Sequence, residues 1–185
     1  MTNIASLIDS LQEILEDKVL KKAPLGNSDI WLKEASARMK IQITGVAPSP
    51  VVVIHMAKAS HLSCLKDGNW KQICDYLLIA EINSNCYAVF IELKKTLTEE
   101  TKPKEQLRRS LPLLNYLLSV CKVEFGNIPK VLPKYAIIAE RLNPRLDKQK
   151  TRIRPSCPVS TENHESIEIM KFITPRISIT KLAAG

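Results

Sequence analysis

Three charged residues lie at the ends of two apolar segments, where their side chains could act together. Asp75 opens the first segment, and Glu92 and Lys94 close the second. If the two segments pair as a hairpin that turns at Asn83 and Ser84, Asp75 lies directly opposite Glu92, with Cβ atoms about 4.5–5.5 Å apart. Glu92 and Lys94 are two residues apart in a strand, so they share a face. The spacing therefore predicts two carboxylates and a lysine at one end of a hydrophobic hairpin.

This arrangement favours metal-assisted chemistry on a phosphate. Two opposed carboxylates repel, and each raises the pKa of the other unless a cation lies between them. Mg²⁺ suits such a place because it binds one or two carboxylates together with phosphate and water. Lys94 could orient or deprotonate an attacking water and stabilise charge in the transition state. The alternative is a structural ion pair of Lys94 with both acids, although this leaves a net negative site on a chain of net charge +8.

The two segments that position these residues are apolar on both faces. Tyr76, Leu78 and Ala80 face one way along the first strand, whereas Leu77 and Ile79 face the other. Strands of this kind are central and covered on both sides. We expect the covers to be two helices, one at the N-terminus and one after the hairpin.

Helical spacing of apolar residues supports both helices. Residues 3–20 carry such a stripe, and 104–121 form the clearest helix, with leucines separated by three and four positions. Pro112 lies inside the second helix and should kink it or remove one backbone bond. Gln106 falls at the margin of the leucine stripe, while Arg109 is expected to point to solvent.

The remaining elements are predicted more simply. Ser28 could cap a short helix over residues 29–38. Strands are expected over 39–46, 51–56 and 135–139, and residues 166–172 and 176–182 form late strands or an ordered tail. We do not expect the pair His55 and His61 to bind a metal.

The order helix, strands, hairpin, helix, strand (α-β-β-β-α-β), with Asp75 on the second core strand and Glu92-Leu93-Lys94 on the third, resembles the PD-(D/E)XK nuclease-like superfamily over roughly residues 50–140. Cys74 stands where the leading proline of the motif would be. The resemblance implies an α/β (α+β) fold with a restriction-endonuclease-like αβββαβ core, a mixed central sheet flanked by helices. It further implies Asp75, Glu92 and the Leu93 carbonyl as metal ligands, Lys94 as the catalytic lysine and Gln106 as a supporting residue.

We expect residues 1–140 to form this nuclease-like core, and residues 141–185 to form a basic loop and a C-terminal extension that pack on the same domain. Residues 141–154 carry six basic side chains against one acid, with Pro144 and Pro155 interrupting the region. They form either a solvated loop or an arm that contacts phosphates. The candidate nucleic-acid contacts are Arg108, Arg109, Arg145, Lys148, Lys150, Arg152 and Arg154.

Composition limits the partners and the compartment. A net charge of +8 favours a polyanion, with nucleic acid before an anionic membrane. Aromatic residues make up only 5% of the chain, which counts against single-strand binders that stack bases. The five cysteines include no CxxC pair, so we expect free thiols in a reducing compartment. No apolar run reaches the ~20 residues of a membrane span, and the N-terminus is unlike a signal peptide, so a cytoplasmic location is predicted.

The sequence thus predicts a nuclease that hydrolyses nucleic-acid phosphodiesters with Mg²⁺ or Mn²⁺, DNA being favoured over RNA. A homodimer or a protein partner is compatible with cleavage of a duplex, since two strands need two sites. A role in phage defence or DNA processing follows from the resemblance alone. The alternatives are a catalytically inactive nucleic-acid-binding or regulatory subunit, and an adaptor whose C-terminal segment docks on a larger assembly.

Overall fold

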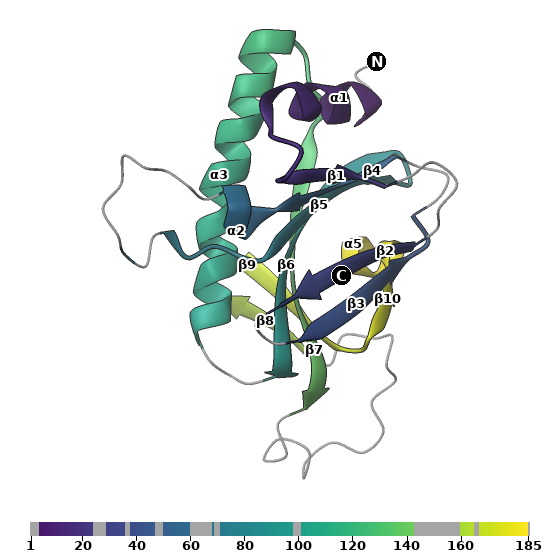
Figure 1. Cartoon of the computed structure of the whole chain (residues 1–185), viewed down its shortest axis with the longest axis vertical. Helices are drawn as coiled ribbons and strands as arrows, with labels where there is room; N and C mark the ends of the chain where they lie inside the picture. Colours follow the sequence, from purple (N-terminus) through teal and green to yellow (C-terminus); the bar gives the residue numbers. More distant parts are fainter. Residues whose placement is uncertain are drawn as a thin grey trace.

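A seven-stranded mixed sheet forms the centre of the chain in the computed structural model (Figure 1). The structure describes residues 4–23, 29–35, 38–46, 50–59, 68, 71–97, 101–142, 160–164 and 167–184. The strand order is β1-β4-β5-β6-β7-β9-β8. The bounds are Leu20–Lys22 for β1, Val51–His55 for β4, Tyr76–Ile82 for β5, Asn85–Leu97 for β6, Val131–Leu142 for β7, Ser160–His164 for β8 and Ile167–Ile173 for β9.

A second, three-stranded sheet and four helices complete the described part. The second sheet has the order β10-β3-β2, with β2 at Asp29–Glu34, β3 at Met39–Thr44 and β10 at Arg176–Ser178. The helices are α1 (Ile4–Ile14), α2 (Met56–Ala59), α3 (Thr101–Phe125) and α5 (Ile179–Ala184). The fold is therefore α/β, with a mixed sheet flanked by helices. Within the described residues, no helix combines the length and hydrophobicity that a membrane crossing requires.

The β5–β6 hairpin has the predicted register. Tyr76 pairs with Ile91, so one further step along the ladder places Asp75 opposite Glu92. Asn83 and Ser84 form the turn with φ of 51° and 62°, the left-handed values that a two-residue type I′ turn requires. The Asn-Ser turn and the register that follows from it are confirmed.

The chain leaves β6 through α3 and returns along β7, parallel to β6. Parallel neighbours need a crossover of this kind, because their ends lie at opposite edges of the sheet. α3 continues through Pro112 over its full 25 residues. β9 then adds parallel to β7, and β8 pairs antiparallel at the edge. The late segment that begins at Ile167 thus belongs to the same central sheet.

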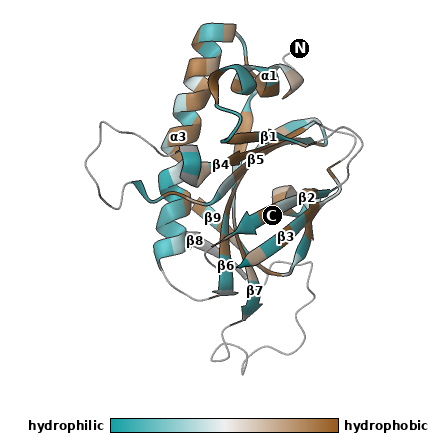
Figure 2. Ribbon diagram, in the orientation of Figure 1, coloured by the Kyte–Doolittle hydropathy of each residue, from teal (hydrophilic) through white to brown (hydrophobic). Residues whose placement is uncertain are grey.

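The central sheet buries two apolar layers, one on each face. Leu77, Ile79 and Phe90 pack in the layer that contains the apolar residues of α1 and α3. Leu78 and Ile91 pack in the layer that contains the inner residues of the second sheet and α5. Figure 1 shows α1 and α3 together on one side, and Figure 2 shows hydrophobic colour on the strands between the layers. The expectation that the two helices are the covers of the two faces is wrong, because the second face is covered by a sheet.

The predicted helix over 29–38 is also wrong. Residues 29–34 form β2, which pairs antiparallel with β3 from Asp29 opposite Thr44 to Glu34 opposite Met39. Ile30 and Leu32 alternate with Trp31, and only Leu32 is fully buried, so the period is two rather than 3.6. Pairing along a full strand and burial of Leu32 outweigh the weak local preference for a cap and a short helix. The late segment 176–182 likewise splits into β10 and the start of α5.

Candidate functional site

Glu92 is a buried charge at the end of the central hairpin. It lies on the α3 side of β6, and its side chain is 1% exposed. Lys94 Nζ contacts Glu92 Oε1 at 2.5 Å, and the lysine side chain is 31% exposed. Lys94 therefore joins the buried carboxylate to the solvent.

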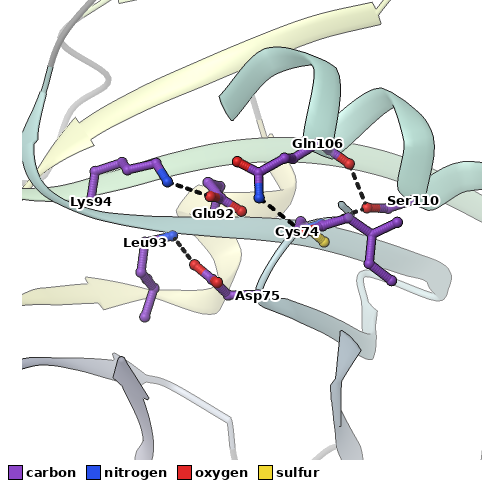
Figure 3. A network of polar contacts seen from close by, with 8 residues as sticks. Cys74, Asp75, Glu92, Leu93, Lys94, Gln106 and Ser110 are labelled. Atoms are coloured by element: carbon purple, nitrogen blue, oxygen red, sulfur yellow. Dashed lines mark hydrogen bonds and ion pairs between the residues drawn. The ribbon is translucent and has the colours of Figure 1, made fainter. Parts of the chain in front are cut away.

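Asp75 makes a different contact. Its carboxylate Oδ2 accepts a hydrogen bond from the Leu93 backbone amide at 2.7 Å. Figure 3 shows the Asp75 carboxylate turned toward the Leu93 amide, whereas Glu92 and Lys94 extend toward α3. The ion pair that the sequence suggested as an alternative thus forms between Lys94 and Glu92, while Asp75 fastens the open end of the hairpin.

Both carboxyls have pKa values far above their ordinary range. Burial, together with the charge of Asp75, raises the pKa of Glu92 to about 7 against the opposing effect of Lys94. Burial also raises the pKa of Asp75 to about 6, with the Leu93 amide lowering it. Near neutral pH the site is therefore short of positive charge, even with Lys94 in contact.

Gln106 brings a third polar group to this place from α3. Its Nε2 donates to the Ile73 carbonyl at 3.2 Å, which leaves the amide oxygen directed elsewhere. Gln106 Oε1 and Glu92 Oε2 are both buried, and neither has a hydrogen-bond partner among the described residues. Figure 3 shows the Gln106 amide beside the Glu92 carboxylate. A buried oxygen without a partner costs about 1–3 kcal/mol, so two such oxygens mark a place for a cation or water.

A buried serine holds α3 against the start of β5. Ser110 Oγ accepts a hydrogen bond from the Cys74 backbone amide at 2.9 Å and donates to the Gln106 carbonyl at 2.7 Å. Ser110 is fully buried. The contact attaches the helix that carries Gln106 to Cys74, the residue directly before Asp75. Sequence reasoning missed Ser110, although its position between two leucines of the helical stripe places it on the buried side.

Glu34 is a further acid that sequence reasoning missed. Its side chain shares a hydrogen bond with the carboxyl of Asp75, and its charge helps to raise the pKa of Asp75. β2 is held in place here because Tyr76 Oη donates to the Lys33 carbonyl at 2.6 Å and accepts from the Lys33 amide. No spacing in the sequence indicates this contact, since it depends on the second sheet packing beside β5.

The basic residues predicted to contact nucleic acid differ in their surroundings. Arg109 is partly buried and pairs with Glu105 at 2.5 Å within α3, so it does not simply point to solvent. Arg108 is exposed on the same helix. The other five candidates, Arg145, Lys148, Lys150, Arg152 and Arg154, lie outside the described residues.

The oxygen atoms that could bind a cation at this end of the hairpin are of more than one chemical type. Among the described residues, no group of three or more His, Cys, Asp or Glu side chains is arranged to hold a metal ion. A cation at this end of the hairpin would have to use Asp75 and Glu92 together with neutral oxygens, namely the Leu93 carbonyl and the Gln106 amide. A mixed set of this kind fits Mg²⁺, which takes few carboxylates and keeps several waters.

Comparison of the chain with protein-family models, with curated proteins and with solved structures finds no match.

Proposed function

We propose that the protein is a metal-dependent nuclease that hydrolyses nucleic-acid phosphodiester bonds with Mg²⁺ or Mn²⁺, and that DNA is its substrate in preference to RNA. The observation that carries the proposal is the pair of buried oxygens without partners, Glu92 Oε2 and Gln106 Oε1. They lie at the end of a hairpin that also holds Asp75 and a solvent-reaching Lys94. A purely structural ion pair needs neither orphan oxygen.

The residues divide the work between binding and proton handling. Asp75, Glu92 and the Leu93 carbonyl would hold the cation, with Gln106 Oε1 completing the oxygen set. A bound divalent cation supplies charge stabilisation for a phosphoryl oxygen and lowers the pKa of bound water. Lys94, released from its contact with Glu92, would position the attacking water from the solvent side and stabilise negative charge on the phosphate.

The topology supports the nuclease proposal at a second level. With β1, β2, β3 and α2 set aside as insertions, α1, the antiparallel strands β4, β5 and β6, the crossover helix α3 and the parallel strand β7 come in the αβββαβ order. This is the order of the PD-(D/E)XK nuclease-like core, and Asp75 directly precedes its second strand while Glu92 lies on its third. A restriction-endonuclease-like core is therefore part of the proposal, as are a cytoplasmic role in phage defence or DNA processing and a homodimer or protein partner for duplex substrates.

Cleavage of supercoiled plasmid and of labelled oligonucleotides with Mg²⁺ or Mn²⁺ tests the proposal. Wild type should cut, while Glu92→Gln and Lys94→Ala should each lose activity by roughly 100-fold or more, since groups that bind the metal or move protons contribute at least this much. Lys95→Ala is the matched control, because Lys95 is exposed and lies on the opposite face of β6 from Lys94. Equal cleavage by all four proteins would falsify the assignment.

One observation favours a second candidate, a catalytically inactive nucleic-acid-binding or regulatory subunit. Lys94 already contacts Glu92 at 2.5 Å, and Asp75 already accepts the Leu93 amide, so part of the site is satisfied without a cation. In that case, wild type would bind DNA in a salt-dependent manner. No cleavage would be seen with either metal, and Glu92→Gln would bind as wild type does.

A further inference from the structure

A cavity of about 350 Å³ lies between the edges of the two sheets, apart from the acidic site. Its walls come from β1 and the residues just before it, from β2 and β4, and from α2. β1 is the edge strand of the central sheet, and β2 is the edge strand of the second sheet. The volume is in the range of pockets that hold small ligands, about 300–1,000 Å³.

The lining is strongly basic. Among the described residues that line it, five are lysines, Lys18, Lys21, Lys22, Lys33 and Lys58, and one is an acid, Asp29. Asp29 already accepts a hydrogen bond from Gln42 Nε2 at 2.6 Å. Lys18 and Lys22 have acidic neighbours, Glu16 and Asp9.

Two of the five lysines, Lys21 and Lys58, differ from Lys18 and Lys22 in their ion pairs. In the described part of the chain, neither Lys21 nor Lys58 has a carboxylate within ion-pair distance. Burial and then Lys58 lower the pKa of His55 against the opposing effects of a backbone hydrogen bond and of Glu34, and Lys21 lowers it by a smaller amount. Among the described residues, these two lysines are therefore available to pair directly with an anion in the cavity.

His55 adds an unused hydrogen-bonding group at the same wall. Its Nδ1 is buried and has no partner among the described residues. The ring lies against Tyr76, with 4.9 Å between ring centroids. An anionic oxygen in the cavity would accept a hydrogen bond from the imidazole.

Trp31 supplies a flat apolar surface on the β2 side. Trp31 lines the cavity and is 47% exposed to solvent. Lys40 Nζ lies 3.8 Å from the centroid of the indole ring and adds a further cation there. An exposed indole beside lysines is the combination that stacks a nucleobase and binds its phosphate.

We propose that this cavity binds a nucleotide, with the phosphate held by Lys21, Lys58 and His55 and the base stacked on Trp31. The nucleotide is either free or the 5′-terminal nucleotide of a strand, since both present the same phosphate and base. The inference does not require cleavage at Glu92, because none of its residues belongs to the acidic site. A peptide added along the edge of β1 or β2 is the competing occupant, but a cavity with one acid against five lysines selects an anion.

Titration of the protein without divalent metal tests this proposal. The probes are ADP, adenosine, inorganic phosphate, and one oligonucleotide with or without a 5′-phosphate. Calorimetry and indole fluorescence measure the binding of each probe. We expect ADP to bind and adenosine to bind at least tenfold more weakly. Tighter binding of the 5′-phosphorylated oligonucleotide than of ADP would identify a strand end as the source, and the reverse would identify a free nucleotide.

Variants separate a built site from general basicity. The double variant Lys21→Ala/Lys58→Ala should weaken ADP binding at least tenfold, whereas Lys122→Ala/Lys130→Ala, which removes the same charge from exposed positions outside the cavity, should not. Trp31→Ala should weaken ADP binding but leave inorganic phosphate unchanged. Unfolding curves of each variant verify that it is folded.

Three results would overturn the proposal: no binding of any phosphate probe, equal losses in the two double variants, or binding of an extended peptide but not of ADP. Failure of the proposed nuclease function can be distinguished from failure of the nucleotide site. Glu92→Gln would then still bind ADP as wild type does, and loss of ADP binding alone would leave cleavage in place.

Discussion

The acidic site and the lysine cavity are neighbours that are built in opposite ways. Asp75 belongs to the first and the next residue, Tyr76, lines the second. The acidic site consists of buried groups that are short of a cation, with Glu92 only 1% exposed. The cavity is lined by exposed lysines, and among the described residues two of them, Lys21 and Lys58, have no carboxylate partner. A metal ion and a phosphate would each supply what one of the two regions lacks.

The difference in burial decides how each region responds to change. A buried charge that loses its partner cannot recover the interaction from water, whereas an exposed lysine can. Substitutions at the acidic site should therefore alter folding stability, and substitutions in the cavity should alter ligand binding with little effect on stability.

The largest expected effect on stability comes from Lys94→Ala. At pH 8 the variant leaves the Glu92 carboxylate buried without its ammonium, and we expect the free energy of unfolding to fall by about 2–4 kcal/mol. At pH 5.5 the loss should be much smaller, because Glu92 then takes up a proton. Urea unfolding at both pH values measures the effect, with Lys95→Ala as the control. A loss that is the same at both pH values would show that Lys94 acts by packing alone.

The next effect is a pH dependence in the wild-type protein. The pKa of Glu92 is raised from 4.5 to about 7 by folding, so between these values the folded protein holds a proton that the unfolded chain has lost. Stability should therefore decrease as pH rises through this range, by about 1–3 kcal/mol, and level off above it. Asp75, raised to about 6, acts in the same direction.

Glu92→Gln should flatten this pH profile, because the amide does not titrate. Mg²⁺ should raise the unfolding temperature of wild type more at pH 8 than at pH 5.5, since it competes with the proton for the carboxylates. A wild-type profile that rises between pH 5 and 7 would contradict both the sign and the cause.

Ser110→Ala should have an effect of about 1–3 kcal/mol, because the Cys74 amide is left buried without an acceptor. Ser119→Ala is a close control. Ser119 makes the same kind of contact, from its hydroxyl to the Asn115 carbonyl at 2.8 Å, but on the exposed side of α3. Chemical denaturation of the two variants measures the difference. Equal stabilities would mean that the Cys74 amide finds another acceptor and that Ser110 does not hold the helix.

The smallest effect on stability is expected for Lys58→Ala. Its charge is exposed, and its removal relieves repulsion with His55, so the change in unfolding free energy should be within about 0.5 kcal/mol. The pKa of His55 should move up toward its ordinary value. NMR titration of the imidazole, assigned with a His55→Gln variant, measures this shift. An unchanged pKa of His55 would show that the charge of Lys58 does not act on the imidazole at the cavity wall.

Local patterns predicted the centre of the molecule well. The Asn83-Ser84 turn and the two apolar faces of the hairpin were sufficient for the register that brings Asp75 opposite Glu92. Both features depend on residues close in sequence, where alternation and turn geometry dominate. Gln106 was identified at the margin of its helical stripe for the same reason, and its amide does reach the end of the hairpin.

The surroundings of the site could not be predicted in the same way. The sequence predicts a helix over 29–38 because Ser28 could cap it, whereas the strand that Asp29–Glu34 form depends on pairing with β3. The contact between Glu34 and Asp75 could not be predicted for the same reason, because Glu34 reaches the site only as part of the second sheet. The lysine cavity was missed entirely because its residues come from four separate segments.

The second sheet is completed by a strand from far along the chain. β10 pairs parallel with β3, Arg176 opposite Gln42 and Ser178 opposite Thr44. During synthesis β2 and β3 emerge long before β10, so they must wait with an unpaired strand edge and a partly uncovered apolar face on the central sheet. Pairings so distant in sequence form slowly, and the exposed edge is open to association with other chains in the meantime. Folding on the ribosome should therefore finish with the second sheet, after the hairpin has already brought Asp75 and Glu92 together.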